Sequence, residues 1–360
     1  MKNVLQSILF VSVVCAHTSS AQWGGGAVAS GSSPVTIAGS ASVYDGYDNV
    51  FASKSGALVQ YYWGPGWVPV TIDSTSWPSP YPGCNTGANS EISAVMNGGD
   101  IELYYVSSSG TTLRHAWFDY GAGLWRCDNV DTGSTFTRPS GLTVGGTSNV
   151  FYINSSTGRL MHAIWNGTWQ KEAIDGPGLF GSGQCNCTVF SLTTESYGSD
   201  NQVFYGASGL RYAYRASAGT GGWALTNFGG PTSTVTAATF VGSELHVFSG
   251  SRHLWWNGSV WQSQSVIDPV SNAPISVQAF TANEFPPGKW ALTVFDGSLA
   301  NWFHFYQAAG GAAPTKDTRP TFLINRQGTP RMSSYVANGN LSVYVEYHNS
   351  TSHVLDQYWR

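Results

Sequence analysis

The sequence contains few charged residues and no cluster of positive charge. Asp, Glu, Lys and Arg make up 10% of the 360 residues, and the formal net charge is -4 at pH 7. A protein that binds the phosphate backbone of nucleic acid needs clustered Lys and Arg, and no basic run is present. The composition therefore argues against a nucleic-acid partner and predicts a surface of Ser, Thr, Asn, Gln, Gly and aromatic side chains.

Long apolar runs and helical periodicity are also scarce. The apolar run VLQSILFVSVVCA at 4–16 follows Lys2 and precedes the small residues SSA at 19–21. This arrangement is typical of a secretory signal peptide over residues 1–21, cleaved before Gln22. We expect a secreted, extracellular protein without a transmembrane segment, since no later stretch is long and apolar enough to cross a bilayer.

Cysteine is rare, with five residues in the chain. Removal of the signal peptide takes Cys15 and leaves an even number, Cys84, Cys127, Cys185 and Cys187. In an oxidising secretory route this predicts two disulfides, with three pairings open. A zinc site is the alternative, but a Cys-x-Cys pair with two distant cysteines lacks the paired CxxC spacing of structural zinc sites.

Sequons are consistent with a secreted glycoprotein, because Asn-x-Ser/Thr is the acceptor for N-glycosylation. The candidate asparagines are Asn154, Asn166, Asn186, Asn257, Asn340 and Asn349.

Motifs of common enzymes and of metal sites are missing. The sequence has neither HExxH nor GxSxG, and it lacks the Asp boxes of sialidases. The acidic ligand set of calcium-binding blades is also missing, since DGYDN at 45–49 is its nearest approach. We therefore assign no cofactor, no metal ligand and no catalytic residue from motifs.

What the chain does contain is a repeated phrase: an apolar strand, a polar turn and a tryptophan. Examples are LVQYYWGPGW at 58–67 and LMHAIWNGTW at 160–169. Alignment of the copies places one polar residue of each in a single column, which we call the column position. Its members are Gln60, His115, His162, Tyr212, His253, Asn301 and Gln357.

Two further markers repeat around the column position. Upstream lies a polar residue followed by Val or Leu and an aromatic ring, as in NVF at 49–51, and downstream most copies carry an indole. A short strand then ends in an acidic residue three times, at Asp73, Asp175 and Asp268.

Repeats of roughly 40 to 50 residues built from short strands are typical of β-propeller blades. The copies are rich in Val, Tyr, Phe, Trp and Thr and are separated by Gly, Ser and Asn, which excludes a helical solenoid. Seven copies predict an all-β, seven-bladed propeller of four-stranded antiparallel blades within residues 22–360. The expected blades span about 40–75, 90–132, 140–176, 187–230, 234–270, 275–326 and 330–360.

The last copy ends at Arg360, after its third strand. Residues 22–39 contain a Trp and a VTI that match the fourth strand of the first full copy. We therefore predict that residues 22–39 close the ring as the outer strand of the last blade, which leaves no open sheet edge between blades.

The repeat pattern resembles the β-propeller lectins, both the fungal fucose-specific lectins and the seven-bladed bacterial lectins of the Photorhabdus type. In the fungal family the sugar lies between adjacent blades, held by an Arg, a Glu and an aromatic ring. The resemblance places the Glu at the column position and the Arg at the first residue of the upstream marker. No Glu stands at the column position here, and no Arg stands at the Arg position, which reads Asn49, Glu102, Asn149, Gln202 and His246.

The residues around the column allow two interpretations. As a binding site, the column supplies groups that hydrogen-bond sugar hydroxyls, neighbouring indoles stack on the sugar ring, and arginines add charged donors. As structure, the histidines hold two blades in register and the indoles pack in the core. The candidate carbohydrate-binding residues are Gln60, Trp63, Arg114, His115, His162, Trp165, Arg211, Tyr212, His253 and Trp256.

Two functions follow. The first is a secreted lectin whose inter-blade pockets bind glycans or polysaccharide by avidity, with fucose or a related sugar as one candidate. The alternative is a polysaccharide lyase or glycoside hydrolase, because propellers also host enzymes. A lyase would use His115 with Arg114, or Tyr212 with Arg211, and a hydrolase would need two convergent carboxylates. Similar residues spread around the ring favour binding over a single catalytic centre.

Overall fold

The computed structural model describes residues 24–32, 37–76, 81–197, 199–216, 222–230, 236–275, 277, 279–296, 302–317, 327–348 and 352–359. The expected signal peptide and the residues Asn301 and Asn349 lie outside these ranges. The described residues form strands and turns without a helix, so none of them belongs to a helix that could span a membrane.

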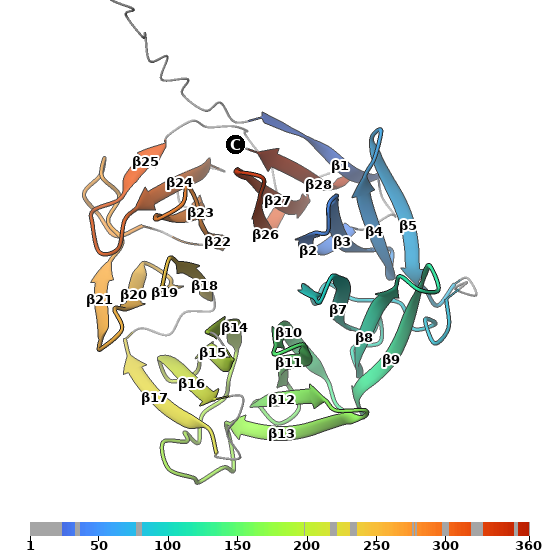
Figure 1. Cartoon of the computed structure of the whole chain (residues 1–360), viewed down its shortest axis with the longest axis horizontal. Coiled ribbons are helices and arrows are strands. Elements are labelled where there is room, and N and C mark those ends of the chain that lie inside the picture. The colour runs from blue at the N-terminus through green and yellow to red at the C-terminus, as the bar shows by residue number, and fades with distance from the viewer. Residues whose placement is uncertain are drawn as a thin grey trace, which may run out of the picture.

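The strands form seven four-stranded antiparallel sheets arranged as blades around a ring, which confirms the predicted β-propeller (Figure 1). Strands of the first four blades, in chain order and four to a blade, are β2 (Ile37–Tyr44), β3 (Asp48–Lys54), β4 (Ala57–Trp63), β5 (Trp67–Asp73), β6 (Ile92–Asn97), β7 (Asp100–Val106), β8 (Thr112–Asp119), β9 (Leu124–Thr132), β10 (Phe136–Val144), β11 (Thr147–Asn154), β12 (Arg159–Trp165), β13 (Trp169–Asp175), β14 (Ser191–Tyr197), β15 (Asp200–Gly206), β16 (Leu210–Ala216) and β17 (Ala224–Gly229).

Within each blade the chain runs outward from the centre of the ring, so that strands such as β10 and β14 lie inside and β13 and β17 outside (Figure 1). Strands of the last three blades are β18 (Thr236–Val241), β19 (Glu244–Ser249), β20 (Arg252–Trp256), β21 (Trp261–Ser265), β22 (Ala279–Glu284), β23 (Trp290–Asp296), β24 (Trp302–Ala308), β25 (Thr315–Asp317), β26 (Gln327–Ala337), β27 (Asn340–His348), β28 (Ser352–Trp359) and the N-terminal β1 (Gly24–Ser32).

The N-terminal strand closes the ring, as predicted. Strand β1 pairs antiparallel with β28, from Gly24 opposite Trp359 to Ser32 opposite Ser352. The closing strand is shorter than the segment 22–39 expected from the sequence, because Ile37 already begins β2 of the first blade. Closure gives β28 a partner for its backbone groups and so removes an exposed edge.

The apolar core is divided into seven clusters, each between two neighbouring blades. Successive residues of a strand point to opposite faces, so both faces of a blade are buried. In β3, for example, Phe51 packs toward the second blade and Val50 toward the seventh. This explains why the second strand of each copy reads as a nearly continuous apolar run.

The repeated indole joins adjacent blades. Each packs edge-to-face on the marker aromatic of the preceding blade, an arrangement that contributes about 0.5–1.5 kcal/mol beyond area burial. The pairs are Trp67 with Tyr344 (6.1 Å), Trp125 with Phe51 (5.8 Å), Trp169 with Tyr104 (6.1 Å), Trp223 with Phe151 (5.6 Å) and Trp261 with Phe204 (5.8 Å).

Strand pairing corrects the sixth member of the column. Column residues pair with the marker aromatic of the second strand, as Gln60 does with Phe51 and Gln357 with Tyr344. In the sixth blade the residue opposite Phe295 is Phe303. Asn301 was therefore misaligned, and the column is not polar in all seven blades.

Candidate functional site

The two ends of the ring differ in chemistry. Because the strands of a blade are antiparallel, the turns after its first and third strands lie at one end, which we call the cavity face. The turn after the second strand and the link to the next blade lie at the other end, which we call the linker face. Three inter-blade cavities open at the cavity face, and three buried-carboxylate clusters lie at the linker face.

The first cavity, of 470 Å³, lies between the first and second blades. At its mouth the Asp45 carboxylate accepts hydrogen bonds from the Tyr120 hydroxyl of the second blade (2.9 Å) and from the Asn49 amide (2.7 Å). Deeper in, the Gln60 amide donates to Asn49 (2.7 Å) and accepts from the Trp125 indole (3.3 Å). The result is an aromatic-walled pocket with a continuous line of polar groups along it.

The second cavity, of 590 Å³, lies between the seventh and first blades. The Gln357 amide donates to the Asp48 carboxylate across the interface (3.0 Å). At the rim, the Asn338 amide of the seventh blade donates to the Tyr44 hydroxyl of the first (2.7 Å). Trp359 also lines this cavity and is 43% exposed.

The third cavity, of 310 Å³, lies between the fourth and fifth blades. Tyr212 and Gln202 of the fourth blade face Trp256 and Trp261 of the fifth. Among the described residues that line this cavity, Asp200 is the one with a carboxylate. The third cavity thus repeats the arrangement of the first: a column residue faces the aromatic rings of the next blade.

The column histidines line none of these three cavities. His115, His162 and His253 are at most 7% exposed. Each lies against the aromatic ring of its own blade and meets an indole of the next blade, edge-on for His115 and His162 and tilted for His253. The rings are Tyr104 (5.1 Å) and Trp169 (5.3 Å) for His115, Phe151 (4.6 Å) and Trp223 (5.3 Å) for His162, and Phe248 (4.6 Å) and Trp290 (5.2 Å) for His253.

Burial and polar partners shift the pKa values of the interior histidines in opposite directions. Burial, with repulsion from His246, lowers the pKa of His253 to about 3, and burial lowers the pKa of His246 to about 4. Burial also acts against protonation of His115, but hydrogen bonds and charges of Asp128 and Glu102 outweigh it and raise the pKa of His115. Burial raises the pKa of Glu102, but the contact with His115 and hydrogen bonds from Ser148 and Asn97 outweigh it and lower the pKa of that carboxyl to about 2.

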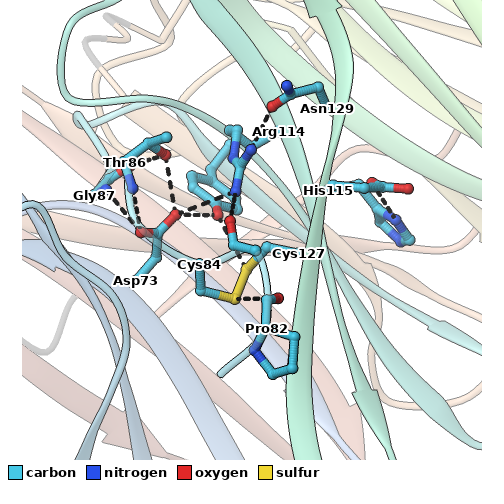
Figure 2. Close-up of a disulfide and its surroundings, with 12 residues drawn as sticks. Asp73, Pro82, Cys84, Thr86, Gly87, Arg114, His115, Cys127 and Asn129 are labelled. Carbon is cyan, nitrogen blue, oxygen red and sulfur yellow. Dashed lines mark hydrogen bonds and ion pairs between the residues drawn. A yellow bond between two sulfur atoms is a disulfide. The ribbon is translucent and has the colours of Figure 1, made fainter. Parts of the chain in front are cut away.

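Arg114 and Arg211 point away from the cavities. Figure 2 shows Arg114 on one side of β8 beside Asp73, and His115 on the other side. This follows from the alternation of side chains along a strand, so His115 and Arg114 cannot act on one substrate. Both arginines are 4% exposed and lie in the buried-carboxylate clusters of the linker face.

The first buried-carboxylate cluster joins the first two blades. Asp73 accepts hydrogen bonds from the Thr86 and Gly87 amides (2.6 and 2.8 Å) and from the Tyr105 hydroxyl of the second blade (2.6 Å). Arg114 lies 3.9 Å from the same carboxylate and bonds the Gly83 carbonyl. A side chain at Gly87 would collide with the Gly56 carbonyl at 2.1 Å, so the tight loop around Asp73 needs glycine there.

The other two clusters repeat this pattern. Asp175 accepts from the Tyr205 hydroxyl (2.6 Å) and from Arg211 (3.0 Å) of the fourth blade. Asp268 accepts from the Tyr306 hydroxyl of the sixth blade (2.8 Å) and pairs with Lys316. The acidic residue that ends three of the sequence repeats therefore ties blades together in pairs.

Both predicted disulfides form, and the structure selects one of the three pairings. Cys84 bonds Cys127 beside the Asp73 cluster (Figure 2), and Cys185 bonds Cys187 beside Asp175. Four of the sequon asparagines, Asn166, Asn186, Asn257 and Asn340, are exposed, and Asn154 is half-buried.

Of the ten candidate binding residues, four line the cavities: Gln60, Trp63, Tyr212 and Trp256. Trp165 is exposed and packs on Trp169, but it lines none of the three cavities. The sequence did not single out the turn and end residues that also line them, among them Tyr47, Tyr120, Asn338 and Trp359. A signal was available in the aromatic turns DGYD at 45–48 and FDYG at 118–121, which lie where blade turns were expected.

No protein-family model matches the chain, and no curated protein matches its sequence. Solved structures match its fold. The BP39L lectin from Burkholderia pseudomallei is 16% identical, with a TM-score of 0.64 over 91% of this chain and 96% of that one. A mutant of AofleA from Arthrobotrys oligospora is 14% identical, with a TM-score of 0.52 over 83% and 91%.

A polysaccharide lyase matches equally well. The PL25 ulvan lyase bound to -[GlcA(1-4)Rha3S]- is 12% identical, with a TM-score of 0.63 over 92% of this chain and 94% of that one. At such identities the likeness is one of fold. The chain therefore has the propeller of known lectins, as the sequence predicted, and the same propeller also carries lyases, so the function has to be argued from the site.

Proposed function

We propose that the protein is a secreted carbohydrate-binding protein that holds neutral sugars in inter-blade cavities of its cavity face. The observation that carries this proposal is the first cavity, where exposed aromatic rings flank a line of carboxylate, amide and hydroxyl groups. A sugar ring presents a C–H face that stacks on an aromatic ring, and hydroxyls that both donate and accept hydrogen bonds. Secretion is part of the proposal and rests on the signal-like N-terminus.

The charges of the cavities favour neutral ligands. None of the three cavities has a Lys or Arg in its described lining. A uronate or sulfated polysaccharide brings negative charge, which would meet Asp45, Asp48 or Asp200 without a cation to balance it. A lyase that acts on uronates needs such a cation, so these cavities support binding of neutral glycans over lyase chemistry.

Hydrolysis is also disfavoured by the carboxylates. Among the described lining residues each cavity has one Asp: Asp45 in the first, Asp48 in the second and Asp200 in the third. Asp45 and Asp48 bond to opposite neighbours of the first blade, Tyr120 of the second blade and Gln357 of the seventh, so they do not face each other across one cavity. A typical glycosidase uses two carboxyl groups that face each other across the scissile bond. Three similar single-carboxylate sites around one ring support multivalent binding, in which weak sites add up on a glycan-coated surface.

A glycan array probed with the secreted recombinant protein tests the proposal. We expect binding to neutral glycans that is insensitive to salt, because no ion pair with the ligand is involved. Release of unsaturated or reducing sugar from plant or microbial polysaccharide, without retention on any array glycan, would replace the lectin by an enzyme.

A further inference from the structure

The first and second cavities are neighbours and share two side chains. Tyr47 and Trp63 of the first blade line both cavities. The first blade stands between the seventh and the second (Figure 1), so the two cavities form one lined surface over three consecutive blades. We call this surface the three-blade groove.

Exposed aromatic rings are concentrated in this groove. Six aromatic side chains of the described residues are exposed: Tyr47, Trp63, Tyr120, Trp165, Phe180 and Trp359. Four of them line the groove, and the other two, Trp165 and Phe180, lie elsewhere. Since large aromatic rings are costly to leave in water, their gathering at one place indicates a surface that is covered by a ligand.

The rings are held in place before any ligand binds. Trp63 packs edge-to-face on Trp67 at 5.4 Å, and Tyr120 packs edge-to-face on Phe118 at 4.8 Å. Tyr120 is fixed further by its hydrogen bond to Asp45. Rings that are already ordered lose little freedom on binding, which favours affinity.

Polar groups lie at both ends of the groove. The Asp45–Tyr120 bond marks the end at the second blade, and the Asn338–Tyr44 bond marks the end at the seventh. Between these ends stand Tyr47 and Trp63, whose rings are 63% and 47% exposed. Polar ends joined by an aromatic middle suit a ligand longer than one sugar unit.

We infer that the three-blade groove binds a linear neutral oligosaccharide, with inner sugar units stacked on Trp63 and Tyr47 and outer units held in the two cavities. This inference rests on the proposed function and deepens it, because it names a chain of sugar units as the ligand. It differs from separate pockets that each take a single sugar residue.

Titration calorimetry with neutral oligosaccharides of one to six units tests the inference, using cello-, manno- and xylo-oligosaccharides and free fucose as probes. We expect the affinity for the best series to rise at least about tenfold from one unit to four, which corresponds to about 1.4 kcal/mol. Trp63→Ala should abolish this gain with length. The matched control is Trp165→Ala, which removes an exposed indole with the same packing on its neighbour and should leave the gain intact.

Two pocket-specific variants separate one long site from two short ones. If a single chain spans the groove, Tyr120→Ala and Asn338→Ala should each weaken the same oligosaccharide, with one ligand bound per groove before and after. Two results would overturn the inference but not sugar binding itself. One is equal affinity for oligosaccharides of one and of six units. The other is that each variant binds one ligand fewer per molecule while the affinity of the remaining site is unchanged. Failure of the unmodified protein to bind any array glycan or probe overturns the proposed function itself.

Discussion

The two faces of the ring use the same residue types in opposite ways. On the linker face, Asp73 is fully buried and its oxygens are occupied by backbone amides, a tyrosine hydroxyl and an arginine. On the cavity face, Asp45 also accepts from a tyrosine hydroxyl, but it lies partly in water beside the exposed rings of Tyr47 and Tyr120. One carboxylate is closed into the protein, and the other is presented to a ligand.

The difference shows that a repeated acidic or aromatic residue does not by itself indicate a function. A polar group that is satisfied and buried adds to stability and to the register of the blades. A polar group that remains accessible next to ordered aromatic rings can exchange its partner for a sugar hydroxyl. Within the cavity face the same contrast recurs between the closed interfaces of His115, His162 and His253 and the open cavities at Gln60 and Tyr212.

Deletion of residues 24–32 should have the largest effect, because it removes the outer strand of the seventh blade, which closes the ring. We expect insolubility or a melting temperature lower by roughly 10 °C or more, since each kcal/mol shifts a large domain by about 2 °C. Calorimetry of the truncated protein provides the measurement. Val28→Ala is the graded control and should cost only about 1–3 kcal/mol, and a soluble truncated protein with unchanged melting would contradict ring closure.

Asp73→Asn and Asp45→Asn compare the two faces directly. Asp73→Asn leaves Arg114 buried without its counter-charge and should cost about 3–5 kcal/mol of unfolding free energy. Asp45→Asn removes a partly exposed charge and should cost less than about 1 kcal/mol. Urea denaturation of both variants gives the two values, and equal losses would show that the faces do not differ as described.

The closed interfaces predict a dependence of stability on pH. His253 stays neutral in the folded protein and titrates in the unfolded chain, so stability should fall as pH drops below about 6.5 by roughly 1.4 kcal/mol per pH unit for this group, until its folded pKa near 3 is reached. His253→Gln places at this position the residue type that Gln60 provides in the first blade, and it should remove this contribution. We therefore expect the urea midpoint of the variant to fall less steeply with decreasing pH than that of the unmodified protein.

His115→Gln is the control with the opposite sign. The pKa of His115 is raised, so its contribution is present below the unfolded pKa and is lost as pH rises through the folded one. The variant should therefore lose more stability in acid than at high pH. Its urea midpoint should fall more steeply with decreasing pH than that of the unmodified protein. Identical profiles for the two variants would contradict the opposite directions of the two pKa shifts.

The smallest expected effect is that of Tyr120→Phe on the cavity face. The change removes one hydroxyl that bonds Asp45, and stability should change by no more than about 0.5 kcal/mol. Glycan affinity should fall about two- to tenfold, as expected for one hydrogen bond of about 0.5–1.5 kcal/mol. Titration calorimetry measures this loss, and unchanged affinity would show that the Tyr120 hydroxyl takes no part in binding.

The fold could be predicted from the sequence because each repeat contains the strands, turns and indole of one blade. Alternation of Val50 and Phe51, the repeated indole and the glycine-rich turns are each required by a blade buried on both faces. Ring closure also followed from the missing strand of the last copy. The alignment of the sixth copy was wrong. Asn301 is polar like the other column residues, but strand pairing places Phe303 at the column position.

The candidate site was only partly predictable. Gln60, Trp63, Tyr212 and Trp256 repeat in register and were found, but the neighbouring turns DGYD and FDYG vary in length and position among copies. Arg114 was placed in the site because it adjoins His115 in sequence, whereas strand alternation sends it to the linker face. Residues that are adjacent along a strand point to opposite faces, so adjacency argues against a shared site. This rule would have removed Arg114 and Arg211 from the candidate binding residues.

We propose that the cavity face binds neutral glycans through Asp45 and Trp63. Titration of the Asp45→Ala/Trp63→Ala double variant with the best array glycan, beside the unmodified protein, measures this dependence. We predict that binding in the first and second cavities is lost while the melting temperature stays within a few degrees. Unchanged affinity and stoichiometry in a folded double variant would contradict the claim.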